Sequence, residues 1–485
     1  MNKSAIILGA GPIGLVTAWH LLKNGWEVKI YEKGSYVGGM CRSWNWNDFI
    51  LDTGPHIFHT PKKEMANLWE SNFSHLMQKG VFWCKNVTGD NFDNFWDYPL
   101  SWESIAEYPK ELKKKILSDI SKIDQSKKNI AKNYNEYIEN LIGPTLRKLF
   151  FEKYPEKVWG IPTSQMTADW APKRIEFREK RTPFYFKEWA AVGKYGTGSV
   201  YNEIKEKIIK LGGKIYLNKE VLGIEYSGFK LKKIKFNKGS NINIRNEDVV
   251  ISSLPITLTS ILLGKKSNLK FRGICSVYIS LNKKTALPKN IHWLYYGNDK
   301  IDFNRVSEAK KMTKYVAPKN KTYLTIETTF SKKDEFDSLS TNEMHKRILD
   351  QALNAKLFNE KEVLDITSNK EYFVYPVQYV GYQKDLSNTM SFLSKFNNFY
   401  SIGTGGEYNY ADSQVIFHKA IDLANNLSQK ENKLNQTIKF NYNFEFNKEV
   451  LIGSKKIGDQ NKAYIIAEVG LNHNGSVDLA KQLIK

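Results

Sequence analysis

A glycine-rich turn near the N-terminus constrains the fold more than any other feature of the sequence. It lies between an apolar segment typical of a strand and a segment with helical spacing, and a second strand-like segment follows. In chain order these are a strand at 4–8, the turn at 9–14, a helix at 15–24 and a strand at 27–31. This is the order of the βαβ unit that opens a Rossmann-type dinucleotide-binding fold, so the sequence predicts an α/β protein.

Three glycines and one acidic residue have separate physical tasks in such a unit. Gly9 allows the tight turn, and Gly11 lets the backbone approach a pyrophosphate at the helix N-terminus. Gly14 lets the helix pack closely on the strand. Glu32 follows 18 positions after Gly14, at the end of the second strand, where it is expected to accept hydrogen bonds from a ribose diol.

The segment 5–22 contains no Asp, Glu, Lys or Arg, which is also typical of a membrane helix or a signal peptide. Glycines and a proline interrupt it in the pattern of the turn, so we expect no membrane span there, and no other segment approaches the length of one.

The three cysteines, Cys41, Cys84 and Cys275, are odd in number and far apart in the sequence. This favours a reducing compartment, the cytoplasm, over a disulfide framework or a cysteine zinc site.

The chain of 485 residues is strongly basic, with 72 Lys and Arg against 51 Asp and Glu, a net charge of +21. Such a balance indicates an anionic partner, which could be nucleic acid, anionic lipid or a phosphorylated substrate. Only nine of the cations are arginine, and the lysines are scattered in the manner of a solvated surface. We therefore expect an anionic small-molecule substrate and no specific nucleic-acid partner.

A second glycine pair follows the βαβ unit. The pattern is E-K-x-x-x-x-G-G-x-x-R over residues 32–42, followed by D-x-G-x-H-x-F-H over residues 52–59. This combination resembles the FAD site of the amine oxidase and protoporphyrinogen oxidase superfamily, which implies FAD as the cofactor. The resemblance places the glycine pair along the FAD diphosphate, gives Arg42 a bidentate role, and puts His56 and His59 near the flavin rather than in a metal site.

The resemblance extends over residues 4–427 and implies a set of cofactor contacts. Part of the set is a glycine segment at 403–406 and the helix start that follows it, whose N–H groups can stabilise negative charge on a reduced flavin. The expected cofactor-binding residues are Gly9, Gly11, Pro12, Ile13, Gly14, Glu32, Lys33, Gly39, Met40, Arg42, His56, Val221, Gly403, Asp412, Ser413 and Gln414.

Within this superfamily several motifs resemble those of the UDP-galactopyranose mutases. They are G-x-H-I-F-H-T at 54–60, Y-x-E-K-x-W-G at 154–160, K-R at 173–174, R-x-x-E-x-K at 305–310, Y-P-V at 375–377 and E-Y-x-Y-x-D at 407–412. The resemblance implies an enzyme in which tyrosine and tryptophan hold uracil while arginines and two tyrosines hold the diphosphate. It assigns substrate binding to Tyr154, Trp159, Arg174, Tyr375 and Tyr410. The implied catalytic residues are Arg305 and His56, with flavin N5 as the main reactive group.

One departure leaves the reaction open. The mutases carry an arginine on the phosphate a few residues before E-Y-x-Y, whereas residues 403–406 are Gly-Thr-Gly-Gly here. Loss of such a bidentate contact removes about 1.5 to 3 kcal/mol of binding. A different sugar, or an oxidase reaction on an amine or another small molecule, therefore stays an alternative. A third is a non-catalytic protein that binds polyanions.

The chain is expected to divide into a discontinuous FAD-binding domain with two insertions, a linker and a further segment. The FAD-binding parts are 1–90, 215–270 and 395–427, the mainly helical insertion is 91–214, the substrate-binding α+β region is 271–394, the linker is 428–451 and the last segment is 452–485. In the helical insertion, a helix beginning near Pro172 would bring Arg174, Arg178 and Arg181 to one face as a cation cluster.

The last segment resembles the start of the N-acetylneuraminate (sialic acid) synthases, whose I-A-E-x-G-x-N-H-x-G motif is matched at 466–475. Glu468, Asn472 and His473 would then lie at the end of the first strand of a β/α barrel. A barrel needs about 250 residues, so we expect a truncated start from a longer two-enzyme fusion. Both resemblances point to surface-glycan biosynthesis, and a homodimer is left open.

Overall fold

The chain forms two separate units in the computed structural model, which describes residues 3–88, 92, 94–124, 130–169, 177–429, 449–452 and 455–458. The large unit comprises residues 1–429 and the second comprises residues 430–485. The boundary lies close to the start of the predicted linker at 428, whose first two residues belong to the last helix of the large unit.

A five-stranded parallel sheet carries the N-terminal glycine turn. Its spatial order is β12 (Lys214–Tyr216), β2 (Glu27–Tyr31), β1 (Ser4–Leu8), β16 (Asp248–Ser252) and β22 (Phe399–Ser401). β1 is buried along its whole length, which is why its apolar run is continuous rather than alternating. The helix α1 (Pro12–Lys23) connects β1 to β2, as the sequence predicts.

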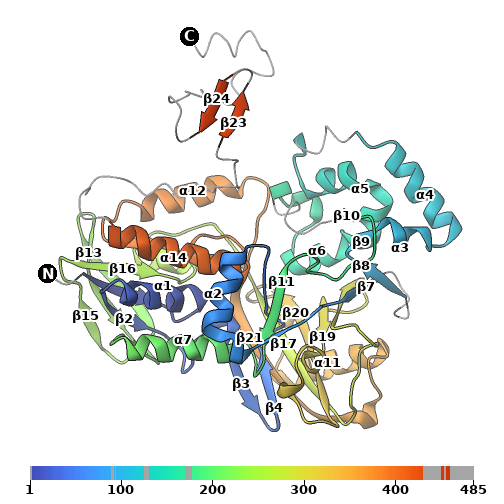
Figure 1. Cartoon of the computed structure of the whole chain (residues 1–485), viewed down its shortest axis with the longest axis horizontal. Coiled ribbons are helices and arrows are strands. Elements are labelled where there is room, and N and C mark those ends of the chain that lie inside the picture. The colour runs from blue at the N-terminus through green and yellow to red at the C-terminus, as the bar shows by residue number, and fades with distance from the viewer. Residues whose placement is uncertain are drawn as a thin grey trace. The chain divides into compact units, whose positions relative to one another are not determined.

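Helices cover one face of this sheet and a second sheet covers the other. On one face, α1 packs between α7 and α14 over Ile7 and Ile30 (Figure 1). On the other face, Ile6, Leu8 and Tyr31 pack against a three-stranded antiparallel sheet. The covering elements are α7 (Gly198–Lys210), α14 (Ser413–Gln429), β13 (Val221–Ser227), β14 (Lys230–Phe236) and β15 (Asn241–Asn243).

A seven-stranded sheet forms the expected substrate region. Its order is β21 (Val363–Pro376), β17 (Phe271–Leu281), β20 (Thr322–Phe330), β19 (Arg305–Ser307), β18 (Trp293–Gly297), β7 (Cys84–Thr88) and β8 (Phe95–Tyr98). All neighbours are antiparallel except β18 and β7. The apolar side of α11 (Thr341–Asn354) packs on it through Met344 and Ile348.

The helical insertion has a core of its own, which includes the fully buried Tyr134 and Ile138. Its longest helix, α5, is broken at Gly143, which has φ of +83° and precedes Pro144. The helices are α3 (Trp102–Ala106), α4 (Lys110–Ser121), α5 (Tyr134–Phe150) and α6 (Lys153–Trp159).

The predicted extent of this insertion, 91–214, differs from the observed packing in two places. First, α7 belongs to the helix layer over the parallel sheet, and β11 (Trp189–Gly193) pairs with β5 (Ile57–Thr60) and β6 (Met77–Lys79). Second, residues 177–178 form β10, which pairs in parallel with β9 (Leu100–Ser101), so the predicted helical face through Arg178 is wrong. Arg174 lies outside the described residues.

The remaining helices and strands connect these layers. They are α2 (Lys63–Phe73), α8 (Ile256–Leu262), α9 (Ala309–Met312), α10 (Glu335–Ser338), α12 (Tyr382–Leu393), α13 (Gly403–Gly406), β3 (Ser43–Trp46) and β4 (Phe49–Asp52). In the second unit, β23 (Glu449–Ile452) and β24 (Lys455–Gly458) pair antiparallel. Glu468, Asn472 and His473 lie outside the described residues, so the synthase-like start stays a prediction.

Among the helices of the described part, none combines the length and the apolar character that a membrane crossing requires.

The contact between α1 and the turn generates a stability prediction. A Cβ on Gly14 would lie 2.2 Å from the Gly9 carbonyl oxygen, so we expect Gly14→Ala to lower the free energy of unfolding. The expected loss is about 1–3 kcal/mol, the usual cost of overpacking. Urea unfolding of the cofactor-free protein measures it.

Gly11→Ala is the matched control, because Gly11 has φ of −73° and a Cβ there would meet no atom of the described residues within 4 Å. We expect its unfolding free energy to stay within about 0.5 kcal/mol of wild type. Equal losses in the two variants would contradict this account of the turn.

Candidate functional site

The two glycine segments predicted to bind the cofactor lie against each other. The Gly9 N–H donates to the Tyr31 carbonyl oxygen at 2.8 Å, which closes the turn between β1 and β2. The Gly38 N–H donates to the Ala10 carbonyl oxygen, also at 2.8 Å. A Cβ on Gly39 would lie only 3.0 Å from the Gly11 Cα, so the glycine pair Gly38–Gly39 packs directly against the N-terminal glycine turn.

The glycines of the turn are required for different reasons: packing within the protein at Gly9 and Gly14, and open space beside the backbone at Gly11. Gly9 has φ of +99°, and a Cβ on it would lie 2.3 Å from the Ser253 hydroxyl, so protein packing alone accounts for this glycine, as it does for Gly14. Gly11 meets no such packing within the described residues. An open backbone position at the N-terminus of a buried helix fits the close approach of a dinucleotide pyrophosphate.

Glu32 lies where the sequence predicts, immediately after β2. Its carboxylate accepts the N–H groups of Ala10 and Gly34, each at 2.8 Å, which ties the acidic residue to the turn. A carboxylate can accept about four hydrogen bonds, so capacity for a ribose hydroxyl is left. Lys33 is exposed, and Val221 begins β13 and packs at the edge of the core that contains Tyr31.

Arg42 connects the second glycine segment to a distant strand. Its guanidinium donates to the Gly39 carbonyl oxygen and to Asn369 Oδ1, both at 3.0 Å, and forms an ion pair with Glu371 on β21. Arg42 thus joins the glycine pair to the seven-stranded sheet, and its bidentate contact with the cofactor stays a prediction. The Met40 carbonyl oxygen likewise accepts the Thr53 hydroxyl within the protein.

His56 is held as a neutral imidazole. Its Nδ1 lies 2.9 Å from the Gly54 carbonyl oxygen and donates to it, which leaves Nε2 as the acceptor nitrogen. Burial, together with the nearby positive charge of Arg305, lowers the pKa of His56 from 6.5 to about 4. The two residues predicted as catalytic are thus brought close together.

Arg305 is fixed by a deeply buried carboxylate. Its guanidinium donates from both Nε and Nη2 to Glu327, with Nη2 at 2.6 Å from Oε1, and Glu327 is only 1% exposed. Burial by itself would lower the pKa of Arg305, but the Glu327 carboxylate outweighs it and raises that pKa well above its usual value. A Cβ on Gly54 would lie 2.7 Å from Glu327 Oε1, so glycine is required beside the pair.

The predicted substrate tyrosines and tryptophan gather around this arginine. The rings of Tyr375 and Tyr410 stack with centroids 5.3 Å apart, and Trp159 meets Tyr375 edge to face at 5.9 Å. Burial raises the pKa of Tyr375 well above its usual value, as does the neighbouring Tyr410, so its hydroxyl keeps its proton. Tyr154 meets Tyr295 at 4.9 Å.

Sequence reasoning missed Tyr295. It pairs with Arg305 across β18 and β19, and burial raises its pKa well above the usual value. The sequence feature that could have indicated it is the aromatic strand 293–297 (WLYYG), which precedes the R-x-x-E-x-K motif.

Two other residues of that motif, Glu308 and Lys310, stabilise loops. Glu308 is fully buried and accepts a hydrogen bond from the Thr285 hydroxyl. Lys310 donates to the carbonyl oxygens of Pro318, Lys319 and Lys321.

The C-terminal glycine segment reaches the same region. Gly403 has φ of +91°, and a Cβ on it would lie 2.7 Å from Ile13 Cγ2, so the segment lies on the first turn of α1. The Asp412 carboxylate lies 3.9 Å from His59 Nε2, and His59 Nδ1 lies 2.7 Å from Glu188. Ser413 and Gln414 are the first residues of α14.

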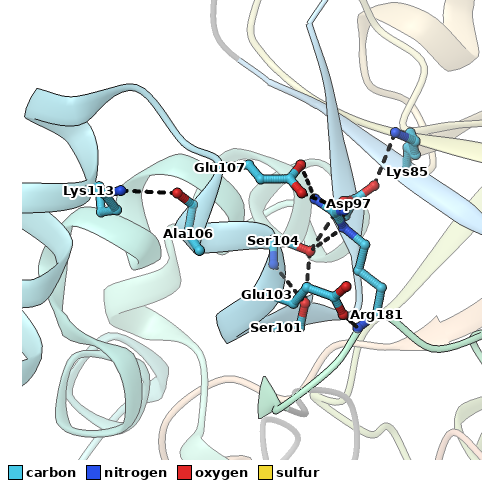
Figure 2. A network of polar contacts seen from close by, with 9 residues as sticks. All are labelled: Lys85, Asp97, Ser101, Glu103, Ser104, Ala106, Glu107, Lys113 and Arg181. Carbon is cyan, nitrogen blue, oxygen red and sulfur yellow. Dashed lines mark hydrogen bonds and ion pairs between the residues drawn. The ribbon is translucent and has the colours of Figure 1, made fainter.

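Arg181 lies in a network of polar contacts with Asp97 and Glu107 (Figure 2). It donates to Asp97 at 2.6 Å and to Glu107 at 2.9 Å, and Lys85 pairs with Asp97 at 3.0 Å. Arg178 donates to the Pro183 and Phe184 carbonyl oxygens at 2.6 and 3.0 Å. These arginines therefore fasten the segment after residue 176 to the helical insertion and its neighbouring loop instead of forming a solvated face.

The neutral state of His56 generates a pH prediction. Because its pKa in the folded protein, about 4, lies below the unfolded value of 6.5, the unfolded chain binds more protons between these values. The stabilising effect is therefore complete above pH 6.5 and is lost as the pH falls toward 4. We expect His56→Gln to lose less stability than wild type between pH 7 and pH 5 in urea unfolding, and equal losses would show that His56 is not the titrating group.

Two sugar-nucleotide mutases are similar to part of this chain. The chain is 28% identical over 197 residues to dTDP-fucopyranose mutase of Escherichia coli, covering 38% of this chain and 49% of that protein. It is 28% identical over 196 residues to a probable UDP-galactopyranose mutase of Klebsiella pneumoniae, covering 38% and 48% respectively. The matches thus span about half the length of these curated relatives.

The fold and the family are shown more broadly. A crystal structure of reduced UDP-galactopyranose mutase superimposes with a TM-score of 0.74, covering 88% of this chain and 94% of that one at 18% identity. The model of the flavin containing amine oxidoreductase family matches residues 14–365. The glycine segments described above fit the flavin dinucleotide that this family carries, and the chain belongs to the family of flavin-containing amine oxidoreductases.

Proposed function

We propose that this protein is a cytoplasmic FAD-dependent mutase that acts on a nucleotide-activated sugar, as UDP-galactopyranose mutase does, in surface-glycan biosynthesis. The observation that carries the proposal is the cluster of Arg305 with Trp159, Tyr375 and Tyr410 beside His56. The names of the two curated relatives support it, since both are sugar-nucleotide mutases.

Three segments of the large unit would hold FAD. The turn at Gly11 would meet the pyrophosphate, Glu32 would accept the ribose hydroxyls, and the segment from Gly403 into α14 would meet the flavin end. FAD, once bound and reduced, supplies a nucleophilic flavin nitrogen to the anomeric carbon of the sugar.

The protein's own residues would bind and orient the sugar nucleotide. Arg305, kept cationic by Glu327, would bind the diphosphate. Tyr375, which keeps its proton, and the neighbouring Tyr410 would donate hydrogen bonds to it. Tyr154 and Trp159 offer aromatic surface to the base. Holding the detached nucleotide near the sugar would keep it available for recapture.

A second candidate is an oxidoreductase that acts on an amine or another small molecule. Two observations favour it: the family description names amine oxidoreductases, and residues 403–406 lack the arginine of the mutases. The same cofactor segments would then place a substrate bond for hydride transfer to the flavin.

The deciding experiment incubates dithionite-reduced, FAD-loaded protein with UDP-galactofuranose, with a parallel sample of the dTDP-fucose pair. Interconversion of the ring forms without net redox change is the expected result. Turnover only with oxidised flavin and an electron acceptor would establish the oxidoreductase instead. Absence of a flavin absorption band after FAD is added would reject both and favour a non-catalytic polyanion-binding protein.

The arginine at the centre of the cluster gives a substitution test. We expect Arg305→Lys to lower kcat/KM by about 10²-fold, because lysine keeps the charge but loses the planar fork that two phosphate oxygens and Glu327 require. Arg347→Lys is the matched control, since Arg347 forms comparable ion pairs with Asp302 and Glu335 away from the cluster. Similar kcat/KM values in the two variants would remove Arg305 from the proposed binding machinery.

A further inference from the structure

An ion pair with a buried carboxylate lies at the end of the C-terminal glycine segment. The Glu407 side chain is only 3% exposed, and Lys419 Nζ on α14 donates to both of its carboxylate oxygens, at 2.8 and 2.9 Å. The carboxylate also accepts the Gly403 N–H at 2.9 Å. One side chain therefore joins the first residue of the segment to the long helix that follows it.

Two hydrogen bonds close the segment into a compact turn. The Glu407 N–H donates to the Gly403 carbonyl oxygen at 2.8 Å, and the Ser401 hydroxyl donates to the Gly406 carbonyl oxygen at 2.7 Å. Because a Cβ on Gly405 would lie 3.3 Å from the Pro255 Cα, the turn is confined on that side as well. Its opposite side lies on Ile13 at the start of α1, beside the glycine turn that fits the cofactor.

An ion pair whose carboxylate is buried has two physical effects in this position. Removing one partner leaves an uncompensated charge in a poorly solvated place, which weakens whatever the pair holds together. In addition, an unbalanced charge acts over a longer distance in a low dielectric than at the surface. The sign of that charge matters for a flavin, because reduction adds negative charge to the ring.

We propose that the Glu407–Lys419 ion pair is a positioning device: it holds the Gly403–Gly406 turn against the N-terminus of α1, and its charge balance sets how readily the bound flavin accepts electrons. The inference rests on the proposed function only in so far as FAD binds at these glycine segments. It assigns neither residue to contact with the substrate.

The test compares FAD affinity and flavin midpoint potential in three variants. Lys419→Met leaves the carboxylate unbalanced and is expected to make the potential more negative, whereas Glu407→Gln leaves the ammonium unbalanced and is expected to make it less negative. The double variant is expected to return toward wild type. Each single variant is expected to bind FAD about tenfold more weakly, equivalent to about 1.4 kcal/mol, in fluorescence titration of the cofactor-free protein.

Two controls separate electrostatics from folding. Lys283→Met removes a comparable ion pair with Glu362, made at 3.0 Å in the substrate region, and is expected to change neither reading. Lys419→Arg keeps the charge and is expected to keep the potential of wild type. If Lys419→Met fails to fold, the less negative potential of Glu407→Gln and the unchanged Lys419→Arg still decide the question.

Results that contradict the role of the ion pair differ from results that contradict the proposed function. Potentials that are unchanged, or that move in the same direction in both single variants, would overturn the inference while FAD binding stands. Wild-type protein that binds no FAD would overturn the proposed function itself.

Discussion

The pairing of Arg305 with Glu327 is the interaction on which the arrangement of the site depends. Glu327 lies in the middle of β20 and is almost completely buried, so its carboxylate must be matched by a cation. Arg305 on the neighbouring strand supplies that cation and presents it to the aromatic cluster. Gly54 is confined against the same pair, and its carbonyl oxygen orients His56. One buried carboxylate thus lies where the seven-stranded sheet meets the D-x-G-x-H-x-F-H segment at residues 52–59.

Much of this arrangement could be predicted because its signals are local. The strand, turn and helix around Gly11 follow from hydrophobic spacing and glycine placement, and the structure has them in that order. The residues drawn from separate motifs, Tyr154, Trp159, Arg305, Tyr375 and Tyr410, are brought together as the resemblance implied. Short motifs are enough to identify these residues, because each side chain is positioned by the helix, strand or loop that contains its own motif.

What could not be predicted depends on partners far away in the chain. The ion pair of Arg42 with Glu371 could not be predicted, because Glu371 is 329 positions away and no local sequence pattern connects the two residues. Arg178 was placed on a helix because its spacing allowed one, whereas pairing of β10 with β9 imposes an extended backbone. Glu308 matched a motif, yet its burial among loop N–H groups makes it a structural residue.

The parallel sheet has a consequence for the order in which the site forms during synthesis. Its two outer strands differ in origin: β12 comes from the middle of the chain, and β22, together with α14, comes only after residue 398. The ribosome therefore completes the helical insertion and the seven-stranded sheet before it delivers the glycine turn that lies on α1. Until then the apolar surface of α1 that faces α14 has no cover, so the nascent protein would keep this surface exposed through most of translation.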